Sequence, residues 1–205
     1  MSRRKIVLAS GNTGKLAEIT KLLGNLPVEP VLQAALDIPP AAETAPTFVE
    51  NALIKARAAA SASGLAAIAD DSGLQVDALE GAPGVHSARY AGRHGDDRAN
   101  IDKLLRQLAT RPGARRSARF RCVAVFLAHA DHPVPLLAEG VWEGEIAPAP
   151  SGNGGFGYDP VFLLPSRGLT AAEIDPLVKN RLSHRGQAFA DLCRQIENFY
   201  RRESR

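Results

Sequence analysis

Residues 66–92, AAIADDSGLQVDALEGAPGVHSARYAG, decide how this chain is interpreted. The apolar run Ala66–Ala69 leads directly into two adjacent carboxylates, Asp70 and Asp71, followed by Ser72-Gly73. This pattern predicts a buried strand that ends in a turn, with the two acids where the strand meets the turn. Adjacent side chains on extended backbone point to opposite sides, so one acid can face a ligand while the other supports it from behind. Taken alone, the four residues 70–73 also fit a solvated turn.

The composition is that of an ordinary globular protein. The 205 residues fit one domain, or one domain with two lobes, and 45% hydrophobic with 23% charged residues argues against a disordered or fibrous chain. The net charge is only +3 although the pI is about 9.1. A surface rich in arginine explains these values better than a polyanionic partner does.

Cysteines and apolar runs indicate the compartment. Cys122 and Cys193 lie in no metal-ligand spacing, so neither a zinc site nor a disulfide scaffold is expected. The run Ile6–Ala9 is too short for a signal peptide, and Cys122–Ala128 is too short to span a bilayer. We therefore expect a cytoplasmic protein with no membrane partner.

The N-terminal segment predicts a strand over 5–9, a glycine loop SGNTGK over 10–15 and a helix over 16–23. Backbone N–H groups at the start of such a helix, with Lys15 beside them, favour a phosphate site. A Walker A loop is excluded, because only two residues separate the glycines and Leu16 follows the lysine. A simple helix cap remains the alternative.

Two further helices are expected in the first half of the chain. Thr47 and Glu50 form a capping box that starts a helix running to about Ser63, with Lys55 on its polar side. Glu43 precedes this helix and is either a loop acid or a metal ligand. A second helix starts at 96, and the arginines after it suggest nucleic acid only weakly, because a strand over 120–128 follows at once.

The second half predicts a hairpin, a glycine-rich loop and two helices. Strands over 134–139 and 141–147 are expected to turn near Gly140, and residues 148–162 form the loop. Phe156 beside Asp159 suits stacking on a planar heterocycle, although Phe156 could also belong to the core. A helix is expected around 171–174, and a last amphipathic helix follows SHRGQA (183–188), where His184 could be only a cap.

Six segments in this order resemble the inosine triphosphate pyrophosphatase family. They are SGNTGK (10–15), TFVENALIKA (47–56), ADDSGL (69–74), GAPGVHSARYAG (81–92), GNGGFGYDPVF (152–162) and SHRGQA (183–188). The resemblance implies an α/β fold with two lobes, a long central mixed β-sheet flanked by helices, and an active-site cleft between the lobes. It covers residues 1–205 as a single ITPase-like domain, and it also implies a homodimer.

The resemblance also implies an activity, the hydrolysis of non-canonical purine nucleoside triphosphates (ITP, dITP, XTP) to the monophosphate and pyrophosphate. Asp71 would be the general base, and Glu43 and Asp71 would be the metal ligands. The residues expected to bind substrate are Ser10, Gly11, Asn12, Thr13, Gly14, Lys15, Lys55, Ser72, Phe156, Gly157, Tyr158, Asp159, Lys179, His184 and Arg185.

Phosphate chemistry explains these assignments. Mg²⁺ prefers oxygen ligands and bridges phosphate oxygens, so we expect Mg²⁺ on Glu43 and Asp71 and positive charge from Lys15 and Lys55 on the phosphates. A donor such as Arg185, or a backbone N–H, would pair with the purine 6-carbonyl. A nucleotide-binding sensor without turnover and a pyrophosphatase for other modified nucleotides remain alternatives, and nucleic acid is not an expected partner.

Overall fold

The structure is a computed structural model that describes residues 3–24 and 26–203. Proximity of Cα atoms divides the chain into two compact units. The first unit contains the chain up to Asp71, Cys122–Gly140 and the chain from Arg185 onward, and the second contains Ser72–Arg121 and Val141–His184.

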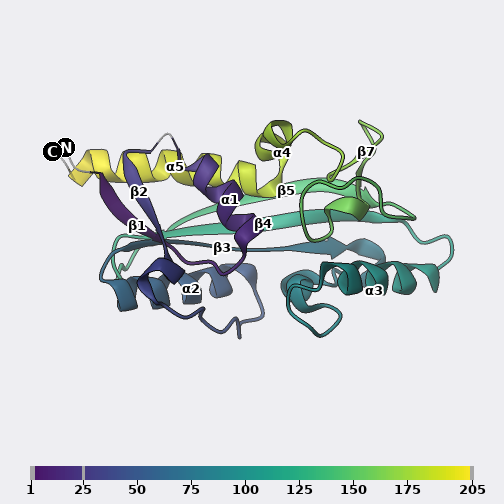
Figure 1. The fold of residues 1–205 in the computed structure, drawn as a ribbon, viewed down its shortest axis with the longest axis horizontal. Coiled ribbons are helices and arrows are strands. Elements are labelled where there is room, and N and C mark those ends of the chain that lie inside the picture. Colours follow the sequence, from purple (N-terminus) through teal and green to yellow (C-terminus); the bar gives the residue numbers. More distant parts are fainter. Residues whose placement is uncertain (1–2, 25, 204–205) are drawn as a thin grey trace. The chain divides into compact units, whose positions relative to one another are not determined.

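Seven strands among the described residues form one sheet, in the order β2-β1-β3-β4-β5-β6-β7 (Figure 1). The strand β1 pairs in parallel with β2 and β3, whereas β6 pairs antiparallel with β5 and β7. The sheet is therefore mixed, as expected. The strands are β1 (Arg4–Leu8), β2 (Val28–Leu32), β3 (Ala66–Val76), β4 (Ser117–Leu127), β5 (Leu136–Ile146), β6 (Phe162–Leu164) and β7 (Leu169–Thr170).

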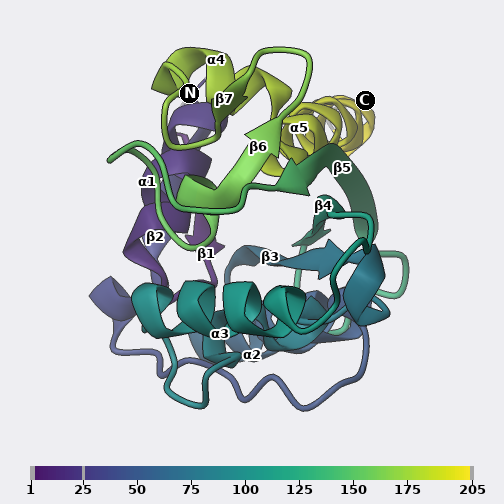
Figure 2. The ribbon, with the colours of Figure 1, turned by 90° about the vertical axis from the view of Figure 1, so that its right-hand side faces the viewer.

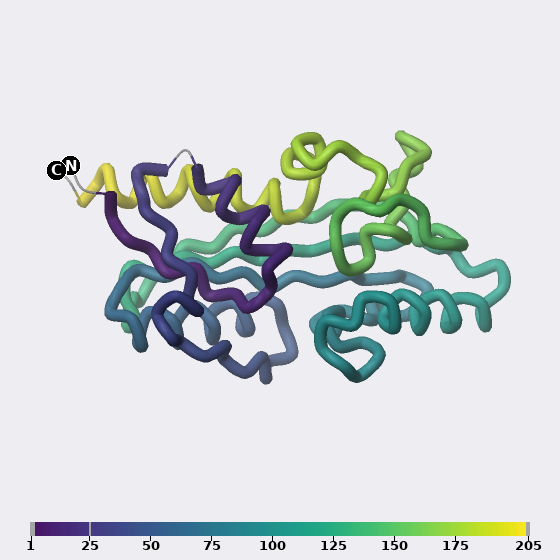
Figure 3. The backbone as a smooth tube through the Cα atoms, in the orientation of Figure 1, coloured from purple at the N-terminus to yellow at the C-terminus, as the bar shows by residue number. Residues whose placement is uncertain are grey.

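The long strands β3, β4 and β5 each contribute residues to both units, and Figure 3 traces their paths. The boundary of the first unit falls within β3, directly after Asp71. The two acids of the sequence pattern therefore lie at the end of the part of β3 that belongs to this unit.

Helices cover both faces of the sheet in the first unit. Figure 1 shows α1 (Thr13–Leu22) and α5 (His184–Glu203) on one side of the strands and α2 (Phe48–Ser63) on the other. Side chains alternate accordingly, since Ile68 packs in the cluster with α1 and α5 while Ala67 and Ala69 pack with α2. This alternation fixes which face each neighbouring residue of β3 presents.

The second unit has its own core. Its helices are α3 (Asp97–Ala109) and α4 (Pro176–Leu182), and Figure 2 shows α3 alongside β3. Leu104 of α3, Trp142 of β5 and Phe162 of β6 belong to one buried cluster. Trp142 is therefore a core residue.

The predicted start and stop of α2 are confirmed, whereas α1 begins at Thr13, inside the predicted glycine loop, and not at Leu16. Asn12 Oδ1 accepts a hydrogen bond from Lys15 N at 3.0 Å, which caps α1. Thr47 Oγ1 accepts from Glu50 N at 3.3 Å, and α2 ends at Gly64 with a φ of 68°. No helix in the described part of the chain is long and apolar enough to cross a membrane.

Two strand predictions were wrong. The strand β3 does not turn after Asp71 but continues to Val76, because Leu74 and Val76 are both 0% exposed and belong to the core of the second unit. The chain also does not reverse at Gly140. Positions 138, 140 and 142 are buried in alternation, so β5 continues through the glycine on the same face.

The prediction of a helix around 171–174 was also wrong, because those residues form a turn after β7. The helix α4 starts instead at Pro176, where Asp175 Oδ1 accepts hydrogen bonds from Leu177 N at 2.8 Å and Val178 N at 3.2 Å. Proline fits the first position of a helix, since its missing N–H would have no partner there.

Candidate active site

Asp70 and Asp71 are both buried and face opposite sides of β3, as predicted. Asp70 Oδ2 lies 3.3 Å from Lys15 Nζ of α1 and 3.5 Å from Arg185 Nε of α5. Asp71 Oδ1 lies 3.2 Å from Lys55 Nζ of α2. Each acid therefore meets a positive charge, but from helices on opposite faces of the sheet.

Glu43, Lys55 and Asp71 form what we call the Lys55 group. Lys55 Nζ lies 2.7 Å from Glu43 Oε1, so one ammonium contacts both carboxylates. Burial lowers the pKa of Lys55, but the surrounding acids, Asp71 first among them, outweigh burial and raise it overall. Lys55 is therefore held in its charged form.

Asp71 has the opposite balance. Burial raises the pKa of Asp71, and the positive charge of Lys55 offsets this only in part. Within the described part of the chain, its buried Oδ2 atom has no hydrogen-bond partner. Asp71 is thus a buried carboxylate with one oxygen available for a further donor or cation.

Asn51 positions the segment before α2, and the sequence analysis missed this role. Its side chain is fully buried, accepts a hydrogen bond from Ala45 N at 2.9 Å and donates one to Ala45 O at 3.1 Å. These bonds fix the backbone two residues after Glu43. An asparagine within a helix is disfavoured by propensity, and that is the signal that could have identified it.

The residues Ser10–Gly14, predicted to bind phosphate, lie at the start of α1. Ser10 Oγ accepts a hydrogen bond from Asn12 N at 3.2 Å, and the Asn12 side chain caps the helix. These two side chains therefore organise the turn itself. The backbone N–H groups of the first helical turn and the Lys15 ammonium are the groups suited to a phosphate there.

Lys15, Glu18, Asp70 and Arg185 form what we call the Asp70 group. Arg185 Nη1 lies 2.5 Å from Glu18 Oε2, and Arg185 is only 2% exposed. The predicted contact of Arg185 with the base stays a prediction. The sequence analysis missed Glu18, although its position three residues after Lys15 places both on one face of α1.

The second unit contains a third set, the Lys179 group, made of Phe156, Asp159 and Lys179. Asp159 Oδ2 lies 2.6 Å from Lys179 Nζ and accepts a hydrogen bond from Phe156 N at 2.9 Å. The Lys179 ammonium lies 5.0 Å from the centroid of the Phe156 ring. The Phe156 ring, the Asp159 carboxylate and the Lys179 ammonium therefore lie together. All three are predicted to contact the purine base of the substrate.

The glycine loop that carries Phe156 is fixed on several sides. Gly155 has a φ of 73°, and a Cβ atom there would lie 2.0 Å from Asp159 Oδ2. Gly157 N donates to Asp97 Oδ2 at 2.7 Å, and the Tyr158 hydroxyl donates to Ser87 O at 2.9 Å. The predicted site residues Gly157 and Tyr158 therefore also stabilise the loop.

Two other predicted residues have clear structural surroundings. His184 is 5% exposed, and its ring stacks on Phe120 with centroids 4.7 Å apart. Ser72 lies within β3, next to Asp71. Contact of either side chain with a substrate stays a prediction.

The carboxylates of Glu43 and Asp71 are the best candidates for a metal site. They already share one cation in Lys55, and hard divalent cations prefer such oxygen donors. Among residues 3–24 and 26–203, no group of three or more His, Cys, Asp or Glu side chains could hold a metal ion. A two-carboxylate site suits Mg²⁺, which usually keeps several waters.

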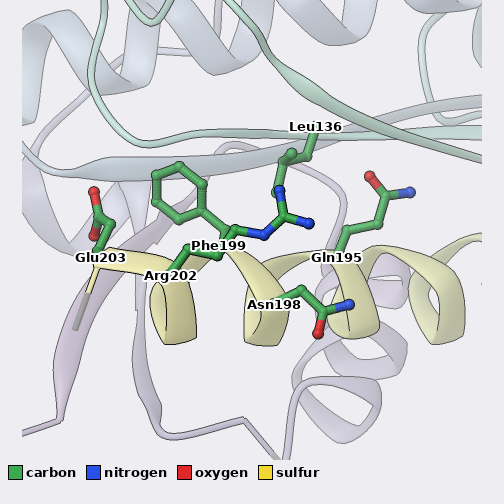
Figure 4. Close-up of a pocket in the computed structure, with 6 residues that line it drawn as sticks. All are labelled: Leu136, Gln195, Asn198, Phe199, Arg202 and Glu203. Atoms are coloured by element: carbon green, nitrogen blue, oxygen red, sulfur yellow. The ribbon is translucent and has the colours of Figure 1, made fainter. Parts of the chain in front are cut away.

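A pocket of about 530 Å³ lies elsewhere in the first unit, between the C-terminal half of α5 and the start of β5 (Figure 4). Its lining residues are not among those predicted for the site. They are Leu136, Gln195, Asn198, Phe199, Arg202 and Glu203.

The fold and the three groups define an α/β protein with paired acids and cations on both faces of one long strand, β3, and a further pair, Asp159 and Lys179, in the second unit. Residues 6–195 match the model of the Ham1 family, and the chain belongs to that family. The family resemblance expected from the six segments is thereby confirmed.

Relatives match over nearly the whole chain. A protein of Methylococcus capsulatus named dITP/XTP pyrophosphatase is 60% identical over 95% of this chain and 96% of its own length. A protein of Vibrio cholerae with the same name is 52% identical over 95% of this chain and 97% of its own.

Solved structures agree. The HAM1 protein of Coxiella burnetii superposes with a TM-score of 0.89 at 50% identity, covering 95% of this chain and 99% of that one. A structure from Mycobacterium abscessus, titled nucleoside-triphosphatase and dITP/XTP pyrophosphatase, gives a TM-score of 0.73 at 46% identity, covering 92% and 98%. The predicted fold class is therefore confirmed.

Proposed function

We propose that this protein hydrolyses deaminated purine nucleoside triphosphates (dITP, ITP and XTP) to the monophosphate and pyrophosphate. The names of close relatives support this activity. The structural observation that carries it is the Lys55 group, in which the buried acid Asp71 and a second acid, Glu43, share one cation. A protein that only bound nucleotides would not need this pair of acids.

In this proposal Asp71 orients the attacking water and takes its proton. The raised pKa of Asp71 makes it a stronger base than an ordinary aspartate, and its Oδ2 atom has the free acceptor capacity. Lys55 holds Oδ1 of the same carboxylate, so the orientation of the acid is fixed before substrate arrives.

Phosphate charge is the second requirement of the reaction. Lys15 and the N-terminus of α1 would bind the phosphate oxygens, because ammonium and backbone N–H groups offset their negative charge. Glu43 and Asp71 would hold Mg²⁺, whose chemistry is to neutralise phosphate charge and make pyrophosphate a better leaving group. The donor set fits this ion, since both carboxylates lie close enough to contact one ammonium, and the buried Oδ2 atom of Asp71 has no hydrogen-bond partner in the described part of the chain.

We assign base recognition to the Lys179 group. Phe156 would stack on the purine, and Lys179 together with backbone N–H groups would face its edge. A donor aimed at a 6-carbonyl disfavours adenine, whose 6-amino group would leave that donor unpaired. Asp159 fixes both Lys179 and the backbone of Phe156, so the ring and the donor keep a constant spacing.

The test is pyrophosphate release from ITP, XTP, GTP and ATP in parallel, with magnesium and with a chelator. Fast magnesium-dependent release from ITP and XTP alone is the expected result. Equal release from all four would keep the catalytic assignment and refute the base assignment. No release from any of them would favour the sensor without turnover.

Two further expectations from the family stay predictions. A homodimer is checked by light scattering on the purified protein, and a cytoplasmic location by fractionation of cells that express it.

A further inference from the structure

We propose that Asp70 is a positioning residue, whose buried carboxylate holds the Lys15 ammonium where it meets the phosphates of the substrate. The proposal rests on the proposed function, in which Lys15 contacts phosphate. Asp70 is not the general base in that reaction, so its burial beside two cations calls for a separate explanation.

Two cations converge on the buried carboxylate of Asp70. Its side chain is 0% exposed, and a single oxygen, Oδ2, lies near both Lys15 Nζ at 3.3 Å and Arg185 Nε at 3.5 Å. A buried carboxylate oxygen therefore lies within ion-pair distance of two cations at once.

The Lys15 side chain needs support at its far end if its ammonium is to meet a ligand at a fixed position. A lysine has a flexible stem, and ordering it costs rotamer entropy of up to about 2 kcal/mol. The Lys15 side chain is 15% exposed, and its backbone N–H is fixed by Asn12. An ion pair with a rigid strand fixes the far end of the side chain as well. One of the three ammonium donors then faces Asp70, and the others remain for a ligand.

Asp70 itself is held rigidly. It lies on β3, in a part of the strand covered on both faces. Arg185 lies on its other side and is tied in turn to Glu18 at 2.5 Å. Two anions and two cations thus balance within one unit, and Asp70 contacts both cations. Because Asp70 is rigid, it holds the Lys15 ammonium at a fixed position relative to the sheet.

A double-mutant cycle tests this connection. The variants are Asp70→Asn, Lys15→Met and the two combined, and the probe is inorganic pyrophosphate, whose affinity is measured by calorimetry without turnover. The same variants are assayed for kcat/KM with ITP. Pyrophosphate reports on the phosphate contacts alone, because it carries no base.

The expected result is non-additivity. Asp70→Asn should weaken pyrophosphate binding about tenfold when Lys15 is present and less than about twofold in the Lys15→Met background, since contacting residues couple strongly. Equal losses in both backgrounds would mean that Asp70 only supports the fold, and would overturn the proposal.

A second variant covers the case in which Asp70→Asn fails to fold. Asp70→Glu keeps the negative charge but moves the carboxylate by one methylene, so the charge balance remains while the contact with Lys15 changes. A folded Asp70→Glu protein should lose about tenfold in affinity, by the same coupling argument. Unchanged affinity in this variant would also overturn the proposal.

Asp77→Asn is the matched control. It removes a carboxylate that pairs with Arg119 at 2.9 Å in the second unit, and pyrophosphate affinity should stay unchanged.

The two measurements, pyrophosphate affinity and turnover of ITP, separate the role of Asp70 from the proposed function. A coupled cycle without turnover of any nucleotide would refute the proposed function alone, whereas turnover of ITP with an additive cycle would refute the role of Asp70 alone.

Discussion

Asp70 and Asp71 are adjacent and chemically identical, yet their surroundings give them different properties. Asp70 faces Lys15 and Arg185, and its pKa is well below the ordinary value. Asp71 faces Lys55, which also contacts Glu43. Burial raises the pKa of Asp71. The alternation of side chains along β3 produces this difference, because it places each acid against a different helix.

The first prediction concerns Asp71→Asn. Removing a general base should lower kcat for ITP by about 10²- to 10⁴-fold. The folded-state pKa of Asp71 is raised, so its charged form is less favourable in the folded than in the unfolded protein at neutral pH. A neutral amide should therefore not lower the thermal midpoint. Pyrophosphate release and thermal unfolding measure the two effects.

Asp102→Asn, on the exposed surface of α3, is the control and should change neither quantity. If Asp71→Asn retains turnover within about threefold of the original protein, a loss far below the usual range for a general base, Asp71 does not carry the reaction.

The second prediction concerns the cysteines. Burial raises the pKa of Cys193 to about 11, and burial together with the charge of Asp70 raises the pKa of Cys122 further. At pH 8 the thiolate fraction of Cys193 is then about 10⁻³, against about a quarter for an ordinary thiol. We expect iodoacetamide to modify the native protein at least about 100-fold more slowly than the protein in urea. Mass spectrometry over time follows both sites. Equal rates of modification in the native protein and in urea would contradict the raised pKa values of the two thiols.

At the scale of elements, the sequence predicted those whose signals are local. The capping box and Gly64 gave the bounds of α2, and the apolar spacing gave α1 and α3. The missed elements depend on more distant residues. The strand β3 continues beyond Ser72-Gly73 because Leu74 and Val76 join a core made largely by later residues. For α4 a local signal existed, the pair Asp175-Pro176, and it was overlooked.

The same distinction applies to the candidate site. Motifs identified Lys55, Asp71, Phe156 and Asp159, because each lies in one of the six segments, whereas Glu43 and Lys179 lie just before a segment. The pairing within the Lys55 group could not be predicted, since it depends on how α2 and the loop before it meet β3. The contact between Glu18 and Arg185 joins residues 167 positions apart, and no local pattern predicts it.

The third prediction concerns the glycine loop. In Gly155→Ala the new Cβ would lie 2.0 Å from Asp159 Oδ2, in a backbone conformation with a φ of 73°. The aspartate must move, which disturbs its contacts with Lys179 and with Phe156 N. We expect a loss of about 3 kcal/mol in the free energy of unfolding, from backbone strain and from the broken contacts, and weaker discrimination between ITP and ATP. Urea denaturation and parallel assays measure these effects.

Gly168→Ala is the matched control. Its φ is 63°, but a Cβ there would meet no atom within 4 Å. This variant should lose only the strain of a left-handed alanine, about 1–2 kcal/mol, and should keep its discrimination between bases. Equal losses of unfolding free energy in both variants would mean that the close approach to Asp159 contributes nothing to the loss.

At the scale of the whole molecule, ion binding and stability are linked. A cation that binds the folded chain and not the unfolded chain stabilises the fold by mass action. Glu43 and Asp71 come from distant parts of the sequence, 28 residues apart by number, and both contact Lys55 only in the folded protein. A magnesium site on these carboxylates should therefore be visible in thermal unfolding, without any substrate.

The fourth prediction follows from this linkage. Magnesium at ten times its dissociation constant should stabilise the protein by about 1.4 kcal/mol, which raises the thermal midpoint by about 3–6 °C for a chain of this size. Glu43→Gln should abolish most of the shift, because it removes one of the two charged ligands. Scanning calorimetry with and without a chelator is the measurement.

Glu29→Gln provides the comparison, since Glu29 is an exposed carboxylate on β2 and its loss changes the net charge equally. If both variants lose the shift, magnesium acts through the overall charge of the protein. If both keep it, the ion binds elsewhere, and Glu43 then acts only as a partner of Lys55. A shift that depends on Glu43 alone would support the two-carboxylate site, because only a specific ligand distinguishes two variants of equal charge.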